Sequence, residues 1–152
     1  DSPTDIMQIL SEKNVTMNNH HYGIWTESFK SNGELNGFFD VLSTNKDRAG
    51  HEFVSTIESF DYPIFGTQWH PEKNIFEWQK NQYGEPYEAI NHSRDAVHIA
   101  QYTTNFFVDQ ARLSKHSYSD KSEEDKALIW NYPVYKTGGS FVQKYYFHFP
   151  TN

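Results

Sequence analysis

Residues 62–73, with the sequence YPIFGTQWHPEK, decide how the rest of the chain is read. The first part of this stretch is rich in aromatic and β-branched residues and predicts a buried strand over 62–69. Pro71 cannot donate a hydrogen bond within a sheet, so a central strand should end near it. His70 and Glu72 would then lie at the carboxyl end of the strand, where open α/β sheets bind their ligands.

His70 and Glu72 are the candidate catalytic pair. Two residues apart on an extended chain, an imidazole and a carboxylate point to the same side, and Pro71 fixes φ between them. Histidine titrates nearest neutral pH and suits general base catalysis. A carboxylate can fix its tautomer and stabilise the imidazolium. A solvated turn after a surface strand explains the same spacing, because catalytic triads are recognised by geometry and not by sequence position.

The motif QWHPE at 68–72 resembles the C-terminal signature of the class I glutamine amidotransferase superfamily. The longer string 62–73 and the tail 123–149 more narrowly resemble the γ-glutamyl hydrolase family. This resemblance implies an α/β fold, a flavodoxin-like three-layer sandwich of the class I glutamine amidotransferase type. Residues 1–152 would supply the C-terminal half of that single domain.

The resemblance also implies a reaction. Members of the family cleave γ-linked glutamate chains with a cysteine nucleophile, which lies on a tight strand-to-helix turn in the N-terminal half. Carried over by the motif, His70 is the general base and Glu72 supports it. The expected substrates are poly-γ-glutamate tails, such as those of folates. A homodimer of the whole enzyme is left open.

The chain contains no cysteine. It can form no disulfide and cannot supply the thiolate that the resemblance calls for. Three explanations stay open: a second chain from the same precursor carries the cysteine, the sequence is an incomplete piece of the enzyme, or the protein is a non-catalytic relative. The sequence opens on Asp1-Ser2-Pro3, which predicts a processed or truncated chain. The expected partner is an N-terminal half, or a partner chain, that carries the cysteine.

His20 is the candidate substrate-binding residue. It lies in the segment 17–25, MNNHHYGIW, which resembles the family's histidine-containing segment beside the active site. A hydrogen bond or a positive charge toward a glutamate carboxylate would be its contribution. The alternative is that His20 and His21 are two exposed loop histidines. A metal site made from these two, His70 and Glu72 matches none of the usual ligand spacings, so we expect no metal and no other cofactor.

Two glycosylation sequons make Asn14 and Asn91 candidate modification sites, in Asn14-Val15-Thr16 and Asn91-His92-Ser93. Sequons are frequent by chance, but two of them agree with the lysosomal, vacuolar or secreted location that the family resemblance implies.

Composition narrows the function classes further. The chain has 152 residues and a net charge of −7, so a single domain is expected. The acidic balance argues against a nucleic-acid partner, because no basic patch is present to neutralise phosphates. No apolar run approaches the roughly 20 residues of a membrane-spanning helix.

The sequence predicts strands over 41–44 and 52–58 that lead into the strand over 62–69. A short helix is expected near the N-terminus and another between 117 and 126, with a terminal strand over 140–149. Residues 79–91 read as a long surface loop. The segment 74–78 is either a wall of the substrate cleft or packing of the turn against the core.

The strongest predicted helix covers 93–114. Ser93 is its candidate N-cap, and Asp95 in the first turn suits the helix dipole. Its apolar residues recur at helical spacing and predict a core-facing stripe: Ala96, Ile99, Ala100, Thr103, Phe107 and Ala111.

Two rival functions remain beside the hydrolase. One is a glutaminase or amidotransferase subunit that hands ammonia to a synthetase, against which the C-terminal extension and the sequons argue. The other is a non-enzymatic structural or binding chain that kept the fold. In the hydrolase interpretation, the chain alone would expose an unpaired sheet edge, so we expect it to be stable only with the N-terminal half present.

Overall fold

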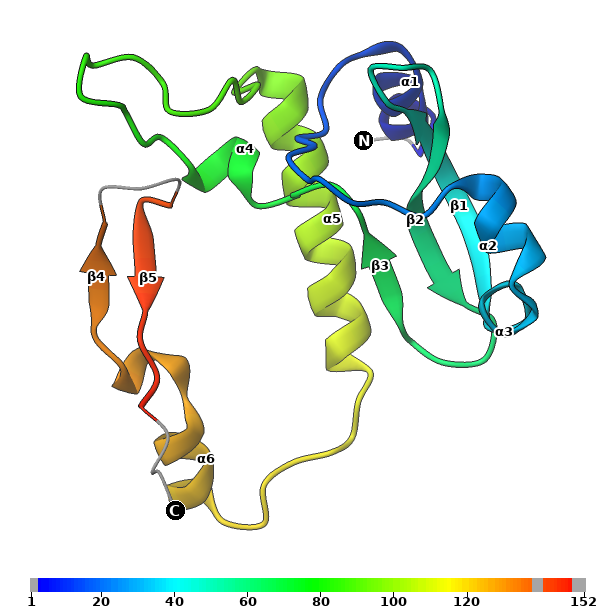
Figure 1. Cartoon of the computed structure of the whole chain (residues 1–152). Coiled ribbons are helices and arrows are strands. Elements are labelled where there is room, and N and C mark those ends of the chain that lie inside the picture. The colour runs from blue at the N-terminus through cyan, green and yellow to red at the C-terminus, as the bar shows by residue number, and fades with distance from the viewer. Residues whose placement is uncertain (1–2, 138–140, 149–152) are drawn as a thin grey trace.

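The computed structural model describes residues 3–137 and 141–148 (Figure 1). Its central sheet has three strands in chain order, β1 (Phe39–Lys46), β2 (Glu52–Ser59) and β3 (Phe65–Thr67), and both pairs are antiparallel. A separate antiparallel pair joins β4 (Val134–Lys136) to β5 (Gln143–Tyr145). The helices are α1 (Pro3–Glu12), α2 (Thr26–Ser31), α3 (Gly33–Phe38), α4 (Lys73–Phe76), α5 (Arg94–Arg112), α6 (Lys121–Ala127) and the 3₁₀ turn η1 (Ile129–Asn131).

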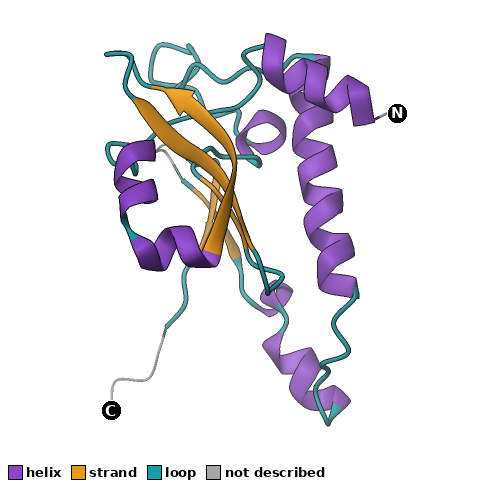
Figure 2. Cartoon of the chain, turned by 90° about the vertical axis from the view of Figure 1, so that its right-hand side faces the viewer, coloured by secondary structure: helices purple, strands orange, loops and turns teal. Residues whose placement is uncertain are grey.

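Helices cover both faces of the central sheet. Figure 2 shows the sheet between the short helices α2 and α3 on one side and the long helix α5 with α1 on the other. This mixture of helix and sheet is compatible with the α/β class. Every strand pair among the described residues is antiparallel, so the flavodoxin-like sandwich with its parallel strands stays a prediction.

The main core lies between α1, the first half of α5 and the end of β3. Its members are buried apolar side chains, and each is less than one-tenth exposed: Ile6, Ile9, Val15, Trp69, Ala96 and Ile99. The indole of Trp69 donates to the Thr56 hydroxyl at 3.2 Å, which ties this core to β2. The buried Trp69 therefore anchors the residues that follow it, which include the candidate catalytic pair.

The predicted buried strand over 62–69 is wrong in its extent. Only Phe65–Thr67 forms β3, which pairs with β2 alone among the described residues, and the side chains of Tyr62 and Ile64 are exposed. Pro63 has no N–H to donate, and the chain before β3 makes a tight turn in which Ile64 N donates to Tyr62 O at 2.7 Å. The strands predicted over 41–44 and 52–58 are confirmed; β1 extends beyond both predicted ends, and β2 is one residue longer at its C-terminal end.

Glycine is required within β3. A Cβ atom at Gly66 would lie 2.9 Å from Cγ1 of Ile57 on the neighbouring strand. That distance is shorter than side chains tolerate, and the β-branched Ile57 has little rotamer freedom to move away. The close approach of the two strands therefore fixes the residue type at this position.

The predicted helix over 93–114 is confirmed as α5. The Ser93 hydroxyl accepts a hydrogen bond from Ala96 N at 3.3 Å, as expected of an N-cap. The predicted apolar stripe is right only in the first half of the helix. Ala96, Ile99 and Ala100 are buried, but Phe107 is 64% exposed, because α1 packs on the beginning of α5 and not on its end. Ala111 is exposed as well.

The C-terminal region confirms the short helix expected after residue 117, which is α6. The predicted strand over 140–149 is present as β5, which is shorter than expected. Ser140 and Phe149 lie outside the described residues.

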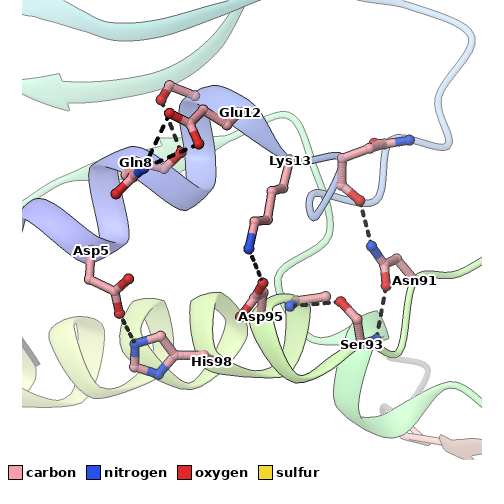
Figure 3. Close-up of polar contacts among 11 residues, drawn as sticks. Asp5, Gln8, Glu12, Lys13, Asn91, Ser93, Asp95 and His98 are labelled. Atoms are coloured by element: carbon pink, nitrogen blue, oxygen red, sulfur yellow. Dashed lines mark hydrogen bonds and ion pairs between the residues drawn. The ribbon is translucent and has the colours of Figure 1, made fainter.

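Polar contacts join α1 and its following loop to the start of α5 (Figure 3). Lys13 forms an ion pair with Asp95, and Asp5 lies 3.9 Å from Nε2 of His98. The hydrogen bond from Lys13 holds the pKa of the Asp95 carboxyl below its ordinary value. The same bond raises the pKa of Lys13.

Replacing Asp95 with asparagine should flatten the acid dependence of stability. A carboxyl whose pKa is lower in the folded state contributes stability above its unfolded pKa, near 3.8, and loses it as the pH falls through the folded value. The wild-type melting temperature should therefore fall more steeply below about pH 4 than that of Asp95→Asn. The difference should be small, because the pair is exposed.

Thermal unfolding of the complete protein across that pH range checks this expectation. The matched control is Asp109→Asn, which removes the exposed Asp109–Arg112 pair within α5 and should keep the wild-type slope. Equal slopes for wild type and Asp95→Asn would contradict the role given to this pair.

Candidate active site

His70 and Glu72 contact each other directly after β3. Nδ1 of His70 lies 3.0 Å from Oε1 of Glu72. An ionised carboxylate can only accept, so Nδ1 carries the proton and donates it to Glu72. Nε2 is then the basic nitrogen, and both side chains are partly exposed, at 36% and 49%. The pair can therefore take a proton from a group that approaches from outside this chain.

The contact does not arise on an extended chain, as the spacing argument assumed. Glu72 has φ −79° and ψ −28°, a helical conformation, and it immediately precedes α4. Its carbonyl accepts from Ile75 N at 3.3 Å and from Phe76 N at 3.2 Å. The strand β3 ends at Thr67, before His70, and the helical conformation of Glu72 ahead of α4 brings the carboxylate back to the imidazole.

The backbone of His70 is tied to the segment that carries His20. His70 N donates to Met17 O at 2.8 Å, in an isolated antiparallel bridge. Two segments that lie far apart in the sequence therefore meet at the candidate site.

His20 is held within its own loop. Its Nδ1 lies 2.9 Å from Tyr22 O, its Nε2 lies 3.2 Å from Oδ1 of Asn18, and its ring meets Phe53 edge-on at 5.2 Å. A Cβ atom at Gly23 would lie 3.8 Å from Cε1 of His20 and 3.9 Å from Oε1 of Gln68. The ring thus lies near the residues that lead into His70.

The four residues weighed as a metal site do not gather into one. Among residues 3–137 and 141–148, no three histidine, aspartate or glutamate side chains converge closely enough to hold a metal ion. His21 is exposed, unlike its half-buried neighbour His20.

The two sequon asparagines lie side by side. Nδ2 of Asn91 donates to the backbone O of Asn14 at 2.6 Å, and Oδ1 of Asn91 accepts from Ser93 N at 2.9 Å (Figure 3). The Asn91 side chain thus links the N-terminal loop to the start of α5. Both residues are exposed.

A buried ion pair follows the motif, and sequence reasoning missed it. Lys73 and Glu88 are joined at 2.6 and 2.9 Å, and their side chains are only 3% and 9% exposed. Glu88 belongs to the segment that the sequence predicts as a surface loop. The only sequence signal was the lysine that ends the motif string.

The segment 74–78 is packed at its beginning, and its role as a wall of the substrate cleft stays a prediction. Asn74 is buried and donates to Asn91 O at 2.7 Å, which is packing. Trp78 is 62% exposed, stacks on His92 with ring centroids 3.7 Å apart, and lines a cavity of about 260 Å³.

None of the helices described here combines the length and the apolar character that crossing a membrane requires.

No family model matches the chain. It is 43% identical to γ-glutamyl hydrolase B of Dictyostelium discoideum over 99% of the chain and 42% of that protein. It is 40% identical to the γ-glutamyl hydrolase of Homo sapiens, over 95% of the chain and 44% of the relative. The probable γ-glutamyl hydrolase 3 of Arabidopsis thaliana is 38% identical, over 88% of the chain and 36% of that relative.

These relatives confirm the resemblance read from the motif. The chain spans about two fifths of the length of the curated relatives that it matches. That coverage is consistent with its being one half of such a protein.

Proposed function

Because almost the whole chain is homologous to part of the γ-glutamyl hydrolases, we propose that it supplies the general base of a cysteine-type γ-glutamyl hydrolase. The observation that carries the proposal is the hydrogen bond between His70 and Glu72, in a chain whose relatives bear that name. The nucleophilic cysteine comes from the N-terminal half, as the same chain or as a partner chain. In this proposal residues 1–152 are the C-terminal half of a flavodoxin-like three-layer sandwich.

The proposed reaction is hydrolysis of the γ-glutamyl isopeptide bonds of poly-γ-glutamate, including folate tails. Nε2 of His70 takes the cysteine proton, and the thiolate attacks the γ-carbonyl carbon. The tetrahedral intermediate collapses to a thioester, and His70 gives its proton to the leaving amine. Water activated by the same nitrogen then cleaves the thioester and releases the free γ-carboxylate.

Glu72 holds His70 in the correct tautomer and stabilises the imidazolium formed at each proton transfer. Backbone N–H groups at the nucleophile turn stabilise the oxyanion. His20 binds a glutamate carboxylate of the substrate. Asn14 and Asn91 are the proposed glycan acceptors, on a route to a lysosome, a vacuole or the outside of the cell.

An assay of the complete protein on matched peptides tests this function. We expect glutamate release from a γ-linked glutamyl peptide and none from the α-linked peptide of the same composition. Free glutamine, with and without a synthetase, is the third substrate. Activity confined to glutamine would favour an amidotransferase subunit instead, and no activity on any of the three would favour a non-catalytic chain.

A further inference from the structure

Glu88 is the meeting point of two segments that carry candidate site residues. Its carboxylate accepts from Nζ of Lys73 at 2.6 and 2.9 Å, and it also accepts from Nδ2 of Asn19. Lys73 follows the His70–Glu72 turn without a gap. Asn19 immediately precedes His20. One carboxylate on a loop thus contacts both segments.

Because this ion pair is buried, it fixes the positions of Lys73 and Glu88 relative to each other. Exposed ion pairs hold long side chains loosely, but the side chains of Lys73 and Glu88 are at least nine-tenths buried. Removing one partner of a buried pair leaves an uncompensated charge, so the pair resists separation. The Lys73 ammonium also lies 5.3 Å from the ring of Phe141, which adds a cation–π contact from the chain just before β5.

We propose that Glu88 is a positioning residue that holds the His70 turn and the His20 loop in a fixed relation. It acts through Lys73 on the turn and through Asn19 on the loop. The hydrogen bond from His70 N to Met17 O is a second link between the His70 turn and the segment that carries His20. The consequence for catalysis rests on the proposed function, because a shift of about 1 Å in a catalytic group can cost about 10²-fold in rate.

Glu88→Gln in the complete protein tests the arm that reaches His70. The amide keeps an oxygen acceptor but loses the charge that Lys73 needs. We expect kcat on a γ-linked glutamyl peptide to fall by about 10- to 100-fold. The matched control is Asp109→Asn, an exposed ion pair on α5 outside the site, which should keep wild-type kcat.

Asn19→Ala tests the other arm alone. It leaves the Lys73–Glu88 pair in place and removes the hydrogen bond beside His20. We expect KM to rise several-fold with kcat nearly unchanged, since His20 is assigned to substrate binding. A fall in kcat with unchanged KM would overturn the division of labour between the two arms.

Hydrogen exchange gives a readout that does not depend on activity. In Glu88→Gln the His70 amide, bonded to Met17 O, should exchange faster, while the Phe29 amide, bonded to Trp25 O in a helix remote from the turn, should not change. Faster exchange at both amides would mean general destabilisation and would overturn positioning, as would unchanged exchange with unchanged kcat. Selective loosening at His70 in a protein without γ-glutamyl activity would uphold the positioning role and reject the proposed function.

Discussion

His70→Ala should lower kcat of the complete enzyme by about 10³- to 10⁴-fold, the range of a general acid–base group. Nδ1 of His70 is hydrogen-bonded to the Glu72 carboxylate in the motif turn, which leaves Nε2 to act as the base. In the proposed mechanism, the variant cannot deprotonate the thiol on attack, and the leaving amine receives no proton. Steady-state kinetics on a γ-linked glutamyl peptide measure the loss.

The control is His116→Ala, an exposed histidine in the loop after α5, which should leave kcat within about twofold of wild type because surface substitutions perturb little. Circular dichroism should show both variants folded, since the His70 side chain is half-exposed and its backbone bond to Met17 survives the change. A His70→Ala enzyme with near-full activity would end the assignment of the base.

The sequence predicted the elements whose signals are local. Ser93 caps α5 because its hydroxyl reaches an N–H within the same turn, and residue type reports such caps well. The strand β2 was found at the predicted residues, although its buried residues Phe53, Val54 and Ser55 are consecutive. The contact between His70 and Glu72 was also predicted, but on an extended chain. The strand-forming residues before the pair favoured an extended backbone, and the short turn at α4 gave no sequence signal strong enough to outweigh them.

Contacts between distant segments could not be predicted in this way. The periodicity of the sequence does not predict that Lys73 is buried, or that Glu88 in a polar loop is its partner. The apolar stripe of α5 has a related limit. Periodicity shows which face of a helix is apolar, but Phe107 shows that it does not report what covers that face.

The second half of α5 and the edge of the sheet have a consequence for the chain on its own. The helix leaves a group of apolar side chains exposed, Tyr102, Phe106, Phe107 and Val108, and the chain before β3 exposes Tyr62 and Ile64. Among the described residues, β3 pairs with β2 alone, so its other edge offers free backbone groups. Exposed apolar side chains and an unpaired strand edge are features that a further protein segment can cover. The relatives are more than twice as long as this chain.

We therefore expect the isolated 152-residue chain to show neither cooperative unfolding nor γ-glutamyl hydrolase activity. It has no cysteine to act as nucleophile, and it leaves these apolar side chains and the β3 edge exposed. Adding the cysteine-bearing half that the proposed function requires should restore both a sharp denaturant transition and activity. Alkylation of that cysteine should abolish the activity and leave the transition in place, because it blocks the nucleophile and not the packing. Reversible, cooperative unfolding of the chain alone would contradict the structural part of this expectation, and thiol-insensitive cleavage by the chain alone would contradict the chemical part.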